Sequence, residues 1–379
     1  MKKTTLYNLI ATFFITMGVS SCADFLDQEN PAYDAEGFYA TEAGLKEGVT
    51  GIYPLLYFDM NWAVPACIVL DHYTAYGLEQ DENSSIGAGG TLNPDNGKIQ
   101  AFWTGEYQIA ARANSVIYGA KDAVAGMSDA ARQYYAEARV LRAYAYYNLI
   151  SAFGDVPFFT APVTIDEYKV GRTPKGEIID FLIKDLNDAA DYLPWTATQR
   201  GRVDKAVAYG LIARMGLFGG SFNVENKATE YFRIAADAAN KVIGKRKLAP
   251  KFSDLFNLTG QAKSEVRDEL LWELMYSTNG TKKLHTVGYG HSSRNYASSV
   301  RFPSSLIVDT YECIDGKRID ESPLYDPKHP TLNRDPRFNA TLAGHGDTIN
   351  YTITDGNNPQ KLILNIYDDK TRFYPRRNA

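Results

Sequence analysis

The 379-residue sequence lacks the short motifs by which many enzymes and metalloproteins are recognised. It has no phosphate-binding G-x-x-x-x-G-K-[ST] loop, no H-E-x-x-H, no C-x-x-C and no G-x-S-x-G. Its five histidines do not have the spacing that places metal ligands on one face of a helix. Asp315-Gly316 is not preceded by the D-x-D-x-D run of a calcium loop. We therefore predict a protein without catalytic residues, metal or cofactor.

The apolar run near the N-terminus is too short to cross a bilayer. It covers residues 6–19, whereas a spanning helix needs about 20 apolar residues. Two lysines precede it, as in a secretory signal peptide. It ends in Val19-Ser20-Ser21-Cys22, which resembles a bacterial lipobox. We predict a lipoprotein signal peptide over residues 1–21, lipid attachment at Cys22 and a lipidated tether over residues 22–35. An ordinary secretory signal that ends near a cysteine is the alternative.

The sequence has fewer basic than acidic side chains, and it has few cysteines. The chain has 40 Lys and Arg against 45 Asp and Glu, and removal of residues 1–21 changes the formal net charge from −5 to −7. Nucleic acids and anionic lipid surfaces require a basic face, so neither is expected as the partner. Besides Cys22 only Cys67 and Cys313 are present. They either form a disulfide in an oxidising compartment or remain two buried thiols.

Helical periodicity is abundant by contrast, because apolar residues recur at three- and four-residue spacing. The predicted helices cover Glu36 to about Tyr57, Phe102–Gly119, Asp129–Phe153, Ile178–Leu193, Asp204–Phe218 and Lys227–Ile243. Gly154 is expected to end the third of these in the αL conformation. Gly219-Gly220 is expected to join the last two. Connections this short favour antiparallel neighbours.

The last two helices carry one copy of a repeat-like pattern. Ala228, Phe232 and Ala235 form A-x-x-x-F-x-x-A, the second-helix pattern of a tetratricopeptide repeat (TPR), and Gly216 falls at the glycine position of the first helix. Small alanines let the helices approach, and Phe232 is expected to fill the gap between layers. We predict TPR-like packing of antiparallel helical pairs.

Two long segments, residues 59–100 and 277–301, are rich in Gly, Asn, Ser and Thr and are predicted to be irregular. Loops of this length in a compact domain are usually functional or disordered. The alternation of apolar and polar residues over 349–353 predicts a half-buried strand. We expect one domain over residues 36–379, with a helical part to about residue 250 and an irregular part with a few short strands over 251–379.

Several segments in order resemble one protein family. They include Leu141-Arg142-Ala143-Tyr144 running into Phe153-Gly154-Asp155-Val156-Pro157, then Gly201-Arg202-Val203, Glu269-Leu270-Leu271-Trp272-Glu273 and Arg334-Asp335-Pro336-Arg337-Phe338. Together with Cys22-Ala23-Asp24-Phe25, these resemble the SusD/RagB family of nutrient-binding lipoproteins. Helix packing and a turn explain Arg142 and Asp155 equally well without a functional role.

The resemblance implies a mostly α-helical, SusD-like fold with TPR-like pairs and an irregular ligand-binding face. It implies no enzymatic activity, an outer-membrane lipid anchor facing the cell exterior, and a SusC-like TonB-dependent transporter as partner. Family members continue with further helices where this chain ends, about 40 residues after Phe338. We expect a C-terminally truncated member whose remaining helices expose an apolar face; a naturally short member is the alternative.

The resemblance also implies that the two irregular segments form the ligand face. Sugars stack on aromatic rings while polar side chains bind their hydroxyl groups. The candidate platforms are Trp62, Tyr73, Tyr76, Tyr289 and Tyr296. The candidate hydrogen-bonding groups are Asp71, Asp81, Asn83, Arg294 and Asn295. Trp103 and Trp272 lie in regular elements and are assigned to the core, whereas Trp195 could belong to either.

Four functions remain open at this stage. The first is a glycan-capturing lipoprotein, and the second is the same fold binding peptides or other oligomers. The third is a lipid-anchored hydrolase, which requires two convergent carboxylates or a metal cluster in a cleft. The fourth is a scaffold that binds only protein and has no exposed aromatic residues on its ligand face. The sequence does not determine the sugar or its linkage.

Overall fold

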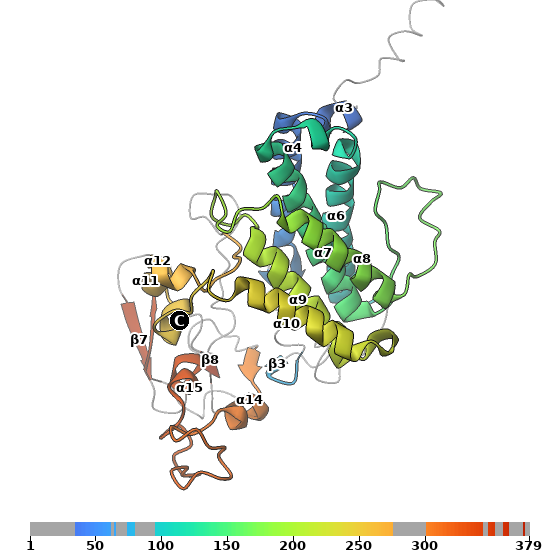
Figure 1. Cartoon of the computed structure of the whole chain (residues 1–379). Helices are drawn as coiled ribbons and strands as arrows, with labels where there is room; N and C mark the ends of the chain where they lie inside the picture. Colours follow the sequence, from blue (N-terminus) through green and yellow to red (C-terminus); the bar gives the residue numbers. More distant parts are fainter. Residues whose placement is uncertain are drawn as a thin grey trace, which may run out of the picture.

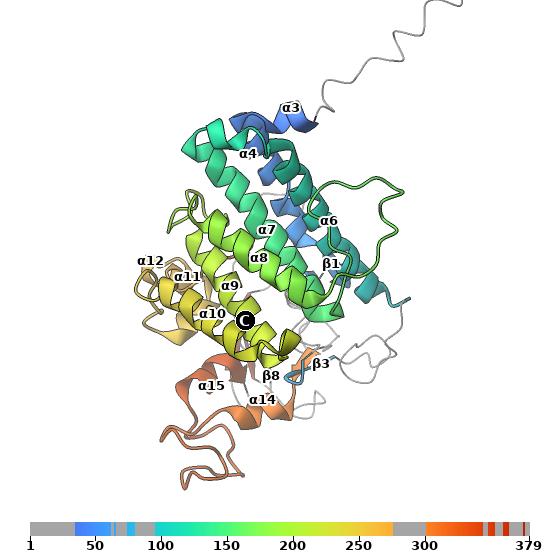
Figure 2. The same ribbon diagram turned by 45° about the vertical axis from the view of Figure 1, so that its right-hand side comes forward.

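A computed structural model describes residues 35–61, 64–65, 74–79, 95–275, 301–343, 348–352, 359–363 and 374–375. The longer helices are α4 (Glu42–Thr50), α6 (Gly97–Ala120), α7 (Asp129–Phe153), α8 (Lys175–Ala190), α9 (Lys205–Ser221) and α10 (Ala228–Val242). They form one body, and the short C-terminal helices α14 (Ser305–Thr310) and α15 (Pro336–Thr341) lie at the end away from α4 (Figures 1 and 2). No helix in the described ranges is long and apolar enough to span a membrane.

Each of the two longest helices begins at a residue whose side chain accepts hydrogen bonds from the free amide groups of the first turn. Asn96 accepts hydrogen bonds from the amides of Lys98 and Ile99 before α6, and Ser128 accepts one from Ala131 before α7. Helix α7 has the predicted bounds. It ends at Gly154, whose φ of 74° is positive as expected but whose ψ of −125° lies outside the predicted αL region.

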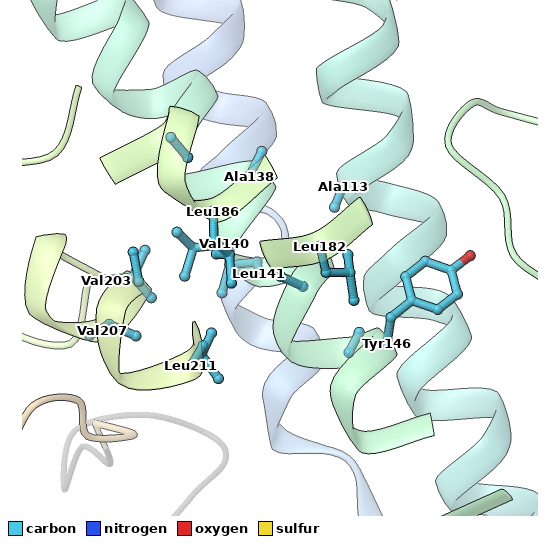
Figure 3. Close-up of a cluster of buried hydrophobic side chains, with 14 of the residues drawn as sticks. Ala113, Ala138, Val140, Leu141, Tyr146, Leu182, Leu186, Val203, Val207 and Leu211 are labelled. Carbon is cyan, nitrogen blue, oxygen red and sulfur yellow. The ribbon is translucent and has the colours of Figure 1, made fainter. Parts of the chain in front are cut away.

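Helix α7 is the centre of the helical body and packs against α4, α6, α8 and α9. Figure 3 shows the cluster at this centre, where Leu141 of α7 lies with Leu182 and Leu186 of α8 and with Val207 and Leu211 of α9. Fully burying one such side chain contributes about 1.5–3 kcal/mol. The apolar stripes predicted from the sequence therefore meet in one core.

The predicted helix over residues 36–57 is broken in the structure. Helix α3 (Ala35–Tyr39) ends before Thr41, whose side chain accepts a hydrogen bond from the amide of Gly44 and starts α4. After α4 the chain forms the short 3₁₀ helix η2 (Tyr53–Tyr57), with Pro54 in its first turn. The prediction was wrong about continuity because the threonine cap and the proline interrupt the apolar periodicity.

Gly219 and Gly220 lie inside α9 and do not join it to α10, so this prediction was also wrong. The connection comes later and contains η5 (Val224–Asn226). A Cβ atom on Gly219 would lie 2.8 Å from the Tyr231 ring, and one on Gly220 would lie 2.6 Å from the Phe232 ring. The glycines therefore allow close helix packing. Gly216 acts in the same way, because its Cβ would meet Ala235 at 2.9 Å.

The α9–α10 pair confirms TPR-like packing but changes the role of its aromatic residues. Tyr231 fills the space between the helices with 1 % of its surface exposed, whereas Phe232 packs only one side against Gly220 and is 44 % exposed. Leu217 of α9 and Ile243, which follows α10, are also exposed.

The expected C-terminal truncation stays a prediction.

The C-terminal part has a small core of its own, formed by Val308, Phe338 and Leu342. Its short strands β5 (Leu342–Ala343) and β8 (Tyr374–Pro375) pair, as do β6 (Thr348–Thr352) and β7 (Pro359–Ile363). Strand β6 confirms the predicted strand over 349–353 to within a residue. Three further short helices, η6 (Phe252–Phe256), α11 (Leu258–Gln261) and α12 (Ser264–Arg267), connect the two parts. Cys313 is a buried free thiol, and Cys67 lies outside the described residues.

Arg142 and Asp155 have the structural roles that helix packing and a turn predict. The buried Arg142 guanidinium donates to Asp185 at 2.8 Å and to the Asn114 side chain at 3.2 Å. Asp155 accepts a hydrogen bond from the amide of Lys175 at 2.9 Å, at the start of α8. These contacts hold the connection between α7 and α8 on the helical body.

Candidate ligand-binding site

Tyr76 is the candidate ligand residue that the structure describes, and it is exposed. Its side chain is 48 % accessible. The remaining candidates lie outside the described residues: Trp62, Asp71, Tyr73, Asp81, Asn83, Tyr289, Arg294, Asn295 and Tyr296. The predicted lipid-attachment residue Cys22 also lies outside them. The geometry of this region is therefore described from the residues that flank the two irregular segments.

The first contact between these flanks is a short antiparallel sheet. Strand β3 (Gly77–Glu79) pairs with β4 (Arg301–Pro303), with Gly77 opposite Pro303 and Glu79 opposite Arg301. Just beyond it, the Tyr76 carbonyl accepts a hydrogen bond from the Ser304 amide at 2.8 Å. The Ser304 hydroxyl donates to the Ala75 carbonyl at 2.6 Å. Tyr76 is thus held at the C-terminal end of the segment that contains Tyr289 and Tyr296.

The second contact lies at the N-terminal ends of both segments. The Tyr57 hydroxyl donates to the Met275 carbonyl at 2.6 Å, across 218 residues of sequence. Strand β1 (Asp59–Asn61), which pairs with β2 (Val64–Pro65), begins two residues after Tyr57. The two irregular segments therefore start from one place and come together again at β3 and β4.

A buried charge network lies next to the place where both irregular segments start, and it fixes that place. The Glu137 carboxylate is fully buried and accepts hydrogen bonds from Arg202 at 2.7 Å and from the Tyr53 hydroxyl at 2.8 Å. Arg202 also donates to the Thr50 hydroxyl at 2.6 Å. Burial and the adjacent Glu137 carboxylate hold the pKa of Tyr53 well above its usual value, so the hydroxyl stays a donor.

The tryptophans assigned to the core do pack against it. Trp103 makes an edge contact with Phe153, and Trp272 makes one with Tyr144 at a ring-centre distance of 5.1 Å. Trp272 also donates its indole N–H to the Gly201 carbonyl at 2.9 Å. Trp195, which the sequence left open, is half-buried and packs on Tyr209.

The described residues contain no group of three or more side chains that could hold a metal ion. Sequence reasoning missed Tyr57 and Met275, because no local pattern indicates a contact between residues so far apart. It also missed Ser304, whose two hydrogen bonds fix the backbone beside Tyr76.

Residues 24–217 match the SusD-like family described as "Starch-binding associating with outer membrane". The chain belongs to the SusD-like family. This SusD-like chain is 27 % identical over 308 residues to SusD-like protein P2 of Formosa agariphila, an alignment that covers 77 % of this chain and 56 % of that protein. It is 31 % identical over 247 residues to the starch-binding protein SusD of Bacteroides thetaiotaomicron, covering 59 % and 42 % of the two chains.

Solved structures support the same fold. A SusD-like carbohydrate-binding protein from Bacteroides fragilis superimposes with a TM-score of 0.69 at 21 % sequence identity, covering 89 % of this SusD-like chain and 68 % of that protein. At this identity the likeness shows the fold alone. The chain spans about half the length of the curated relatives it matches.

Proposed function

We propose that this SusD-like protein captures glycans at the outer surface of a bacterial outer membrane and has no catalytic role. The observation that carries the proposal is the double contact between the two irregular segments, at Tyr57–Met275 and at β3–β4. These contacts support a shared ligand face for the aromatic residues of both segments. Stacking of sugar C–H groups on aromatic rings is the expected mode of recognition.

The proposal extends to anchoring and transfer of the ligand. The lipobox at Cys22 supports attachment to membrane lipid by an acyl chain, and the family description supports the outer membrane as the location. A SusC-like TonB-dependent transporter is proposed as the partner that receives the glycan. The tether of residues 22–35 would let the protein remain anchored while its ligand face opens and closes over that partner.

Affinity electrophoresis of residues 23–379 in gels cast with a panel of polysaccharides tests glycan capture. We expect one polysaccharide to retard the protein. Combined substitution Trp62→Ala, Tyr73→Ala and Tyr76→Ala should abolish the retardation, because each alanine removes a stacking surface. Tyr192→Ala is the matched control, since Tyr192 is 49 % exposed, close to the 48 % of Tyr76, and follows α8 in the sequence, outside both irregular segments.

A folded protein that no polysaccharide retards would contradict glycan capture. Repeating the binding experiment with a panel of peptides in place of the polysaccharides would then test the alternative ligand class, since tyrosine side chains also bind peptides. Retardation that persists in the triple variant would contradict the proposed face and leave glycan binding itself intact. Circular dichroism establishes that each variant is folded before it is compared.

A further inference from the structure

A small cavity opens at the surface where three distant chain segments meet. Its volume is about 160 Å³, which corresponds to roughly five water molecules. The first wall comes from α4 and η2, with Thr50, Tyr53, Leu56 and Tyr57. The other walls are residues 199–202 and the pair Leu274 and Met275.

The turn over residues 199–202 is held in a shape that requires glycine. Gly201 has a φ of +88°, and a Cβ atom there would lie 2.7 Å from Cγ of Met275. Trp272 binds the Gly201 carbonyl from one side, and Arg202 is paired with the buried Glu137 on the other. Because the walls are fixed by buried contacts, the cavity exists before any ligand binds.

The rim presents hydrogen-bonding groups at fixed positions. Arg200 and Glu273 form a two-pronged ion pair, with N–O distances of 2.5 and 2.8 Å. Among the described residues, none accepts a hydrogen bond from the second terminal nitrogen of Arg200. The Gln199 side-chain amide likewise has no partner within the described ranges. Both side chains are exposed, so these groups can bind the hydroxyls of a ligand.

The rim also carries apolar surface beside these polar groups. Met275 is 40 % exposed, and the Tyr57 ring lies half-buried next to it. A pyranose ring needs this combination, because its C–H face packs on apolar atoms while its hydroxyls require donors and acceptors at the edge. Since the Arg200 and Glu273 charges neutralise each other, the rim favours a neutral sugar over a charged one.

The cavity lies at the Tyr57–Met275 contact, where both irregular segments start. We infer that it is a subsite for one neutral sugar ring, at one end of an oligosaccharide that extends onto the proposed ligand face. This inference rests on the proposed glycan-binding function. The polymer would then be bound at two places, by aromatic stacking on the irregular segments and by hydrogen bonds at the Gln199–Arg200 rim.

Methyl resonances of ¹³C-methionine give a readout that is specific for this cavity. Residues 23–379 labelled in this way would be titrated with maltohexaose, cellohexaose, mannohexaose and xylohexaose. We expect the hexasaccharide that binds to shift the Met275 resonance and to leave Met215, which is fully buried in α9, unchanged. Gln199→Ala should weaken that binding by about threefold to tenfold, the loss expected for one hydrogen bond. Gln108→Ala, an exposed glutamine on α6, is the matched control.

The outcomes separate the cavity from the proposed ligand face. If a hexasaccharide binds and Tyr76→Ala weakens it, but Met275 does not shift and Gln199→Ala has no effect, the cavity is not a subsite and the proposed function stands. If Met275 shifts and Gln199→Ala weakens binding while Tyr76→Ala does not, the cavity is a site and the proposed face is wrong. If the protein binds none of the four hexasaccharides, the inference is overturned.

Discussion

The helical body and the C-terminal lobe of residues 301–343 both bury arginine, but they satisfy it in different ways. In the helical body Arg202 pairs with Glu137, and Arg142 pairs with Asp185. In the lobe Arg334, which is 3 % exposed, donates to the backbone carbonyls of Pro330, Val308 and Tyr311 at 2.6–2.9 Å. Carbonyls within a helix already accept hydrogen bonds from the next turn, so they are poor partners for a cation between helices, and acidic side chains pair with Arg202 and Arg142 instead.

The carbonyls around Arg334 are of another kind. Val308 and Tyr311 lie at the end of α14, where carbonyls have no partner within the helix. The guanidinium also packs on the Phe338 ring, 4.5 Å from its centre. The lobe core has few apolar side chains, whereas that of the helical body draws on six helices. Arg334 therefore adds three hydrogen bonds and a ring contact to a core with few apolar side chains.

Breaking a buried ion pair in the helical body should have the largest effect. Arg202→Met leaves the fully buried Glu137 carboxylate without its cation, and we expect the free energy of unfolding to fall by about 3–5 kcal/mol. Urea denaturation measures it. Arg233→Met is the control, because Arg233 and Asp237 form an exposed pair on α10 that contributes less than about 1 kcal/mol. Equal losses in both variants would contradict the importance of burial.

A buried acid without a cation should make the helical body less stable as the pH rises from 4.5 to about 8. Burial raises the pKa of Glu106 from 4.5 to about 8, and the carboxyl accepts one hydrogen bond, from Asn148 at 2.8 Å. Because the folded-state pKa is raised, the stabilisation is complete below pH 4.5 and is lost as the pH rises through 8.

Glu106→Gln removes this titration. Relative to the variant, the natural protein should lose roughly 3 kcal/mol of unfolding free energy between acidic and neutral pH. Urea denaturation of both proteins across this pH range measures the difference. Parallel pH profiles for the two proteins would show that Glu106 does not carry the proton.

The smallest loss of stability is expected in the lobe. Arg334→Met keeps an apolar chain of similar length but removes the hydrogen bonds to the carbonyls, so roughly 2 kcal/mol should be lost. Hydrogen exchange should accelerate in α14 and α15 and stay unchanged in α7. Arg318→Met, at an exposed position of the same lobe, should have no effect. Faster exchange throughout the helical body would mean that the lobe and the helices unfold together.

Sequence reasoning predicted α7 to the residue because the apolar stripe and the final glycine agree there. It failed at Gly219-Gly220, since a glycine pair that breaks a helix and one that admits a neighbouring ring look the same in sequence. It failed at residues 36–57 because the Thr41 cap lies inside an otherwise continuous pattern. For the ligand face it identified Tyr76 as a candidate but not the partners that hold it.

The sequence by itself determined most of the long helices, the family and the TPR-like pairing, because periodicity and short motifs act within a few residues of one another. Only the tertiary structure decided that Tyr57 meets Met275, that Ser304 binds the backbone beside Tyr76, and that Glu137 lies beneath both Tyr53 and Arg202. These contacts join residues between 65 and 229 positions apart. Such pairs depend on how whole helices pack, which no local pattern encodes.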